Sequence, residues 1–208
     1  MFKTAKKVKE TIKGTNIKEE TKTTKNFIID MFKNPLEKIK EVANDDSNKF
    51  FKTAIILVIA WTILIFIGST YSTIYYWGFA RVFKNILSVL KEILAPAIGI
   101  LVYSAIVLVL NKKNKKALPT IISTVTITQI PLMLSALALL LTIISSNISL
   151  VTTPFAKICS VVTIILGYFG FKNLFGEDDD KVFIKKYVLI QVVYYVAYIV
   201  IKLLGIHI

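Results

Sequence analysis

Two rows of polar side chains lie within otherwise apolar stretches of this sequence, and they are the residues best suited to contact a polar ligand. One row recurs at steps of three or four residues: Tyr187, Gln191, Tyr194, Tyr198 and Lys202. The other comprises Thr120, Thr124 and Thr128, followed by Gln129 and Pro131. Such spacing places each row on one helical face. The rows predict either packing inside a helix bundle or a polar path for a substrate, and packing is favoured because a threonine hydroxyl can bond to its own helix.

Small residues form two further candidate contact sites. Ala95 precedes Gly99 by four residues, and Thr163 precedes Gly167 by the same interval. Small residues at this spacing let two membrane helices approach closely, so that dispersion forces act between their backbones. We expect both pairs to mark helix contact faces, within the chain or with another protein.

The residues that usually carry enzymatic or metal chemistry are scarce. The 208 residues include one cysteine, Cys159, and one histidine, His207, so the chain has no internal disulfide and no zinc cluster of its own. The acidic run from Glu177 to Asp180 offers oxygen atoms to a divalent cation, but it lacks the spacing of a calcium loop and is interpreted as a solvated turn. The sequence also lacks a phosphate-binding loop. We therefore expect no enzymatic activity, no metal and no cofactor.

The distribution of charge indicates a membrane protein. Hydrophobic residues make up 55% of the chain, and the 40 residues between Lys116 and Lys157 carry no charge. A soluble domain of this size needs polar helix and strand faces. A net charge of +13 is compatible with nucleic-acid binding, but 25 of the 26 basic residues are lysines and no aromatic-basic recognition motif is present. The expected partner is the lipid bilayer, with no nucleic acid.

The apolar runs predict an all-α, polytopic integral membrane protein, a bundle of five transmembrane helices with amphipathic interfacial helices. Each run can cross about 30 Å of hydrocarbon as a helix. The predicted spans are about residues 53–70, 93–110, 118–144, 155–175 and 186–206. Two short spans with a turn near Met133 are an alternative for the third, but the surrounding residues lack turn chemistry, so one span is favoured.

The segments outside the spans are amphipathic or polar. Residues 1–26 are rich in Lys, Thr and Glu and predict a mobile or weakly helical segment. Asn34 and Pro35 predict a short helix over residues 35–43 with Asn34 as its cap, and a second interfacial helix is expected over residues 79–90. Apolar residues interleaved with lysines predict that residues 27–43 lie along the inner membrane surface.

The lysines also predict an orientation. With the amino terminus in the cytoplasm and the carboxyl terminus outside, five spans place 21 basic residues inside and five outside. The six-span alternative gives a weaker bias of 19 to 7. The five-span orientation is therefore preferred.

The order of these features resembles the bacterial form of the Yip-one (Ypt-interacting protein) family. The similarity rests on Asn34-Pro35 opening a short helix, a basic loop after the second span, Pro131 preceded by Thr and Gln, and Gly167 and Gly170 in the fourth span. It implies a basic cytoplasmic segment at residues 1–33 and a Yip-like membrane domain at residues 34–208. Eukaryotic members are associated with membrane traffic and small GTPases, but their Asp-Leu-Tyr-Gly-Pro signature is absent from this sequence.

These observations predict a non-enzymatic, multi-pass protein of the bacterial cytoplasmic membrane. It would assemble with other integral membrane proteins or with itself, for example as an accessory subunit of an export or envelope machine. The alternative is a small-solute or lipid transporter. A transporter should have a broken helix near the middle of the membrane, and Pro131 beside Gln129 is the candidate break.

Overall fold

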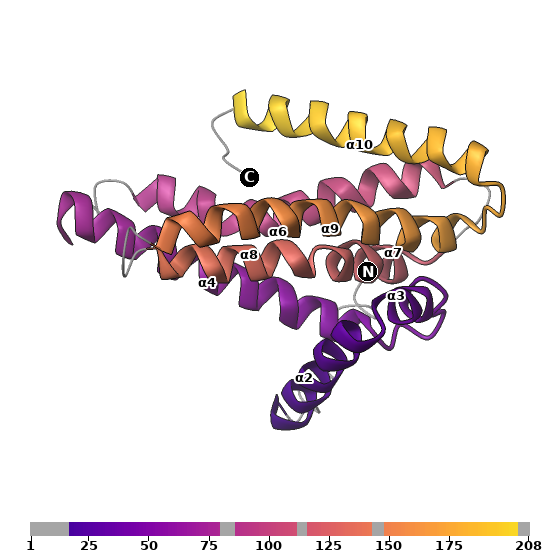
Figure 1. The fold of residues 1–208 in the computed structure, drawn as a ribbon, viewed down its shortest axis with the longest axis horizontal. Helices are drawn as coiled ribbons and strands as arrows, with labels where there is room; N and C mark the ends of the chain where they lie inside the picture. The colour runs from indigo at the N-terminus through magenta and orange to yellow at the C-terminus, as the bar shows by residue number, and fades with distance from the viewer. Residues whose placement is uncertain (1–16, 80–85, 112–115, 143–147, 204–208) are drawn as a thin grey trace, which may run out of the picture.

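The computed structural model describes residues 17–79, 86–111, 116–142 and 148–203, whose regular structure is entirely α-helical (Figure 1). The helices follow the order α2 (Ile17–Lys33), α3 (Pro35–Ala43), α4 (Phe51–Trp77), α6 (Ile86–Leu110), α7 (Leu118–Thr128), α8 (Ile130–Leu141), α9 (Ser149–Phe175) and α10 (Asp180–Leu203). In Figure 1 the helices from α4 to α10 run roughly along the long axis of the molecule, whereas α2 projects from their side.

Five helical stretches are long and apolar enough to cross a membrane. They are Phe51–Tyr71, Leu90–Leu110, Leu118–Ala138, Ser149–Phe175 and Asp180–Leu203. This confirms the all-helical prediction with five spans. The turn that the six-span alternative requires is not formed, because Met133 is buried inside α8.

Several spanning helices begin or end beyond their predicted bounds. α4 continues to Trp77, so the aromatic residues after the predicted first span belong to the same helix. The separate interfacial helix expected over residues 79–90 is wrong for residues 86–90, which form the start of α6, and residues 80–85 lie outside the described part of the chain. Residues 86–92 contain neither glycine nor proline, so the helix continues through them into the span.

The fourth and fifth spans each begin six residues earlier than predicted. Pro154, one residue before the predicted fourth span, lies inside α9, and membrane helices tolerate proline where neighbouring groups satisfy the freed backbone. α10 begins at Asp180 because Asp179 caps it: the Asp179 Oδ1 atom accepts the backbone N–H of Lys181 at 2.8 Å and that of Val182 at 3.4 Å. The acidic run thus starts a helix.

The third span is interrupted at Gln129, so the single helix predicted over residues 118–144 is two helices in succession. Pro131 has no N–H to donate to the carbonyl of Ile127, and its ring displaces that carbonyl. The Gln129 N–H instead bonds to the Thr126 carbonyl at 3.1 Å, three residues back. The regular pattern resumes where the Met133 N–H donates to the Gln129 carbonyl at 3.1 Å.

The two amino-terminal helices differ from their predicted form. α2 is a regular helix from Ile17, so the weakly helical prediction is wrong for residues 17–26, while residues 1–16 lie outside the described part. The capping bond predicted for Asn34 is wrong: its side chain makes none, and its backbone N–H donates to the Asp30 carbonyl at 2.9 Å in the pattern of α2. α3 buries Ile39 and Val42 against the bundle. Phe27 and Met31 of α2 are buried as well, whereas Ile29, Phe32 and Leu36 are exposed. Membrane contact of residues 27–43 stays a prediction, and these three side chains are the ones available for it.

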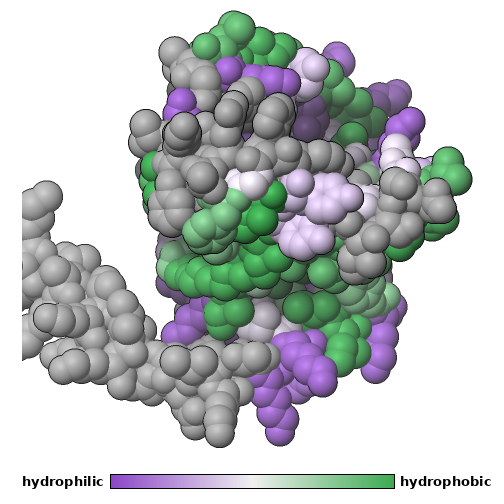
Figure 2. Space-filling view, turned by 90° about the vertical axis from the view of Figure 1, so that its left-hand side faces the viewer, coloured by the Kyte–Doolittle hydropathy of each residue, from purple (hydrophilic) through white to green (hydrophobic). Residues whose placement is uncertain are grey.

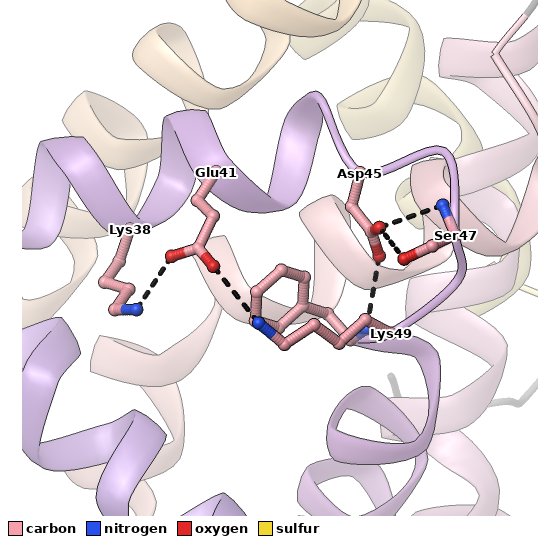
Figure 3. Close-up of polar contacts among 6 residues, drawn as sticks. Lys38, Glu41, Asp45, Ser47 and Lys49 are labelled. Carbon is pink, nitrogen blue, oxygen red and sulfur yellow. Dashed lines mark hydrogen bonds and ion pairs between the residues drawn. The ribbon is translucent and has the colours of Figure 1, made fainter.

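A polar network shapes the turn between α3 and α4 (Figure 3). The Asp45 carboxylate accepts the backbone N–H of Ser47 at 2.9 Å, its hydroxyl at 2.5 Å, and the N–H of Phe50 at 3.3 Å. Partial burial opposes ionisation of Asp45, but these hydrogen bonds outweigh it and lower its pKa. Lys38 donates to Glu41 at 2.7 Å, and this bond lowers the pKa of the Glu41 carboxyl.

A glycine lets three helices meet in the core. A Cβ atom on Gly170 of α9 would lie 3.0 Å from the Cγ2 atom of Thr128 and 3.1 Å from those of Thr124 and Ile39. The contact joins α9 to α7 and α3. The absence of a side chain at Gly170 thus lets α3 pack closely against α9 and α7.

Candidate functional site

α10 packs on the bundle through its amino-terminal half. The buried residues of this helix are Phe183, Tyr187 and Ile190. From Gln191 onward every described residue is at least partly exposed. In Figure 1, α10 diverges from α9 towards its carboxyl end, drawn in yellow. The amino-terminal half of the helix is therefore an anchor, and the carboxyl-terminal half is less closely packed.

A cavity of about 720 Å³ lies beside this second half and is called the α10 groove. Six parts of the chain line it: Trp61 of α4, Ala95 and Gly99 of α6, Gln129 at the break of the third span, Leu132 of α8, Ser160 of α9, and Tyr198 and Lys202 of α10. Its volume falls within the range of roughly 300–1,000 Å³ that is usual for small-molecule sites. The groove is the candidate functional site.

Three side chains close the inner end of the groove. The Gln191 Nε2 atom donates to the Tyr103 hydroxyl at 2.5 Å, and the rings of Tyr103 and Tyr194 stack with their centroids 4.3 Å apart. Tyr103 and Tyr194 both line the cavity. Together they form its floor.

The two long walls run from this floor to an open end. On α10, Tyr194, Tyr198 and Lys202 are separated by one turn each, and α6 presents Tyr103, Gly99 and Ala95 at the same spacing in the opposite chain direction. Eight residues of helix rise about 12 Å. Since Tyr194 and Tyr103 meet at the floor, Lys202 and Ala95 lie at the other end. Lys202 is the one charged residue in the part of the lining that the structure describes.

The structure divides the predicted polar row of α10 between two roles. Tyr187 packs inside the bundle and donates to the carbonyl of Ile164 at 2.5 Å. Gln191 and Tyr194 form the floor contacts, whereas Tyr198 and Lys202 line the groove. One face of α10 thus packs against the bundle at Tyr187 and lines the groove at Tyr198 and Lys202.

The threonine row of the third span lies elsewhere. The Thr120 hydroxyl donates to the backbone carbonyl of Asp45 at 2.7 Å, and those of Thr124 and Thr128 donate to carbonyls of their own helix at 2.9 and 2.8 Å. These hydroxyls are occupied within the protein. Gln129 is the member of this row that lines the groove, and the buried Pro131 acts through the helix break that places it there.

The small-residue pairs also have different surroundings. Ala95 and Gly99 line the groove, where their small side chains leave room. Thr163 and Gly167 are buried on α9, and a Cβ atom on Gly167 would lie 2.8 Å from the Tyr187 hydroxyl. The second pair therefore faces a close helix contact within the chain.

Sequence reasoning missed Trp61 and Tyr103. Both lie well inside apolar spans, whereas tryptophan and tyrosine are usually enriched near membrane boundaries. That unusual depth was the available signal. It indicates an aromatic residue with a specific partner or cavity, as the stacking of Tyr103 on Tyr194 shows.

The acidic run at the start of α10 is used for structure. Glu177 pairs with Lys186, and Asp180 pairs with Lys172 at 2.6 Å. Across the residues that the structure describes, no group of three or more His, Cys, Asp or Glu side chains is placed to hold a metal ion. Cys159 is buried on α9. His207 lies beyond the described residues.

No protein-family model, curated protein or solved structure matches the chain significantly. The functional conclusion therefore rests on the groove itself. Its walls are mainly apolar and aromatic, a few hydroxyl and amide groups interrupt them, and one cation lies at the open end. Such a surface suits a molecule with an apolar body and a polar end.

Proposed function

We propose that this multi-pass membrane protein binds a membrane amphiphile, a lipid or a lipid-like molecule, in the α10 groove. The observation that carries the proposal is the cavity of about 720 Å³ beside the less closely packed half of α10. It favours the lipid-transporter alternative over a path for a polar solute, because the walls are mainly apolar. The protein's own contribution is binding and passage without covalent chemistry.

The arrangement of α10 supplies a route of entry. The helix is anchored at Phe183, Tyr187 and Ile190, and the residues beyond them are not buried. A lipid already in the bilayer can therefore reach the groove sideways. The interior of the bilayer is as apolar as the groove, so the affinity of the groove for a lipid must come from close packing and polar contacts. Gln129, at the helix break, offers an amide to the groove within a span, as broken helices do in transporters.

Filling the groove tests this function. Ala95→Leu places a larger side chain in the groove, whereas Ala105→Leu makes the same change on an exposed position of α6 that does not line it. Overlap with a bound lipid costs about 1–3 kcal/mol, so we expect at least a roughly fivefold loss of retained lipid in Ala95→Leu. Native mass spectrometry after purification in mild detergent measures this. Equal retention by the two variants would refute the proposal.

Assembly with other integral membrane proteins, or self-association, is a second candidate. The outward side of α10 carries the exposed residues Val192, Val196 and Ile199, which provide a continuous surface for another transmembrane helix. We propose on this basis, and on the resemblance to the bacterial Yip-one family, a role as an accessory subunit of an export or envelope machine. Disulfide crosslinking from a cysteine at Val196, compared with one at the buried Ile190, tests it.

We propose the bacterial cytoplasmic membrane as the location, with the amino terminus inside and the carboxyl terminus outside. The lysine bias of 21 to five supports this orientation. Lys202 and the open end of the groove would then face the outer leaflet.

A further inference from the structure

We infer that the lipid in the α10 groove is an anionic phospholipid, with its headgroup at Lys202 and one acyl chain running along the groove towards Tyr103. The inference rests on the proposed function, because it names the headgroup chemistry and the orientation of a lipid in the same site. Three features of the groove lead to it: its charge, its gradient of polarity and its width.

Among the described residues that line the groove, the charge lies at one end only. Lys202 is in the last turn of α10, where the helix dipole favours a cation, and its side chain is exposed. The nearest acidic residue along the opposite wall is Glu92, one turn beyond Ala95, and it accepts a hydrogen bond from Ser69 of α4. A lysine ammonium near the membrane surface attracts an anionic phosphate by about 1 kcal/mol.

Polarity falls from Lys202 through Tyr198 to an apolar stretch that the Gln129 amide interrupts. Tyr198 lies one turn below Lys202, and its phenol can donate to an ester carbonyl of a glycerolipid. Deeper in, Trp61, Ile100 and Leu132 line an apolar space that ends at the stacked Tyr103 and Tyr194. Headgroup, ester and chain therefore each meet a matching surface in the order in which they occur in a phospholipid.

The width of the groove favours a thin occupant. The rings of Tyr103 on α6 and Tyr194 on α10 are in contact, with their centroids 4.3 Å apart, so the gap between the two helices closes at this end of the groove. A helix with side chains is about 10–12 Å across. An acyl chain is far thinner, so it can follow the groove further towards Tyr103.

Headgroup competition on the full chain tests the inference. The protein in mild detergent is offered phosphatidylglycerol and phosphatidylcholine with identical acyl chains, and native mass spectrometry measures their ratio in the complex. We expect wild type to favour phosphatidylglycerol roughly fivefold, which corresponds to about 1 kcal/mol for one lysine near an anionic phosphate. Lys202→Gln should bind both lipids equally, and Lys202→Arg should keep the preference.

The matched control is Lys185→Gln, which removes an exposed lysine from the anchored end of the same helix. It should leave the preference unchanged. Equal binding of the two lipids by wild type, an unchanged preference in Lys202→Gln, or an equal loss in Lys185→Gln would each overturn the headgroup assignment. Those results would leave lipid binding intact, whereas its failure appears separately, as equal lipid retention by Ala95→Leu and Ala105→Leu.

Discussion

Replacement of Gly170 by alanine probes the point where α9 contacts α7 and α3. The added methyl group would lie 3.0 Å from the Thr128 Cγ2 atom and 3.1 Å from those of Thr124 and Ile39, so all three neighbours must shift. Overpacking of this kind costs about 1–3 kcal/mol. Alanine favours the helix over glycine by about 1 kcal/mol. We therefore expect a net loss of about 0–2 kcal/mol in the free energy of unfolding.

A second substitution separates this contact from any general effect on the helix. Thr128→Ser removes the nearest methyl group but keeps the hydroxyl that donates to the Val125 carbonyl. In combination with Gly170→Ala it should recover about 1 kcal/mol relative to additivity. Thr126→Ser is the control, because Thr126 is a buried threonine of the same helix whose methyl group is not among the three nearest atoms.

The measurement is unfolding of the full chain in mixed micelles by titration with a denaturing detergent, followed by far-ultraviolet circular dichroism. The control pair should be additive within about 0.5 kcal/mol. If Thr128→Ser and Thr126→Ser gave the same coupling with Gly170→Ala, the close contact of α7 and α9 would be refuted.

Three further results are expected. A reporter fused after Ile208 should be extracytoplasmic and one inserted within residues 112–116 cytoplasmic, and a cytoplasmic signal from the first would exclude the proposed orientation. Phe32 of α2 is 59% exposed. The emission of a fluorescent probe at this position should therefore shift to the blue when the protein is reconstituted into anionic vesicles, and the shift should weaken with salt. A salt-independent, water-like spectrum would contradict membrane contact. Hydrogen bonds lower the pKa of Asp45 in the folded protein, so its carboxylate stabilises the fold at pH values above its ordinary pKa of about 3.9. This stabilisation is lost as the pH falls through the lower pKa of the folded state. Between about pH 5 and pH 3 the thermal midpoint of wild type should therefore fall more steeply than that of Asp45→Asn. Equal slopes for the two proteins would contradict stabilisation by the Asp45 carboxylate.

The number and order of the spans could be predicted because charge and hydropathy act locally. A run without charges, such as the 40 residues before Lys157, has few ways to avoid the bilayer. Helix ends were harder, since they depend on single side chains. Asp179 starts α10 through two hydrogen bonds, and its acidic neighbours drew attention away from this capping role.

The groove could be predicted only in part. The spacing of Tyr194, Tyr198 and Lys202 correctly indicates one helical face, because helical periodicity is a property of the chain itself. Whether that face packs or lines a cavity depends on its distance from Trp61 and Ala95, which belong to other spans. Periodicity within one helix carries no information on the separation between helices.

The same small residues account for both the groove and the less closely packed half of α10. In the anchored half, the rings of Phe183 and Tyr187 lie 5.1 and 5.5 Å from that of Tyr168 on α9. Beyond Tyr194 the facing wall of α6 offers Gly99 and Ala95, which have little or no side chain to fill the space. Binding and stability should therefore oppose each other here. Ala95→Leu, which should reduce lipid retention, should also supply the contact that α10 lacks and raise the free energy of unfolding of the lipid-free protein.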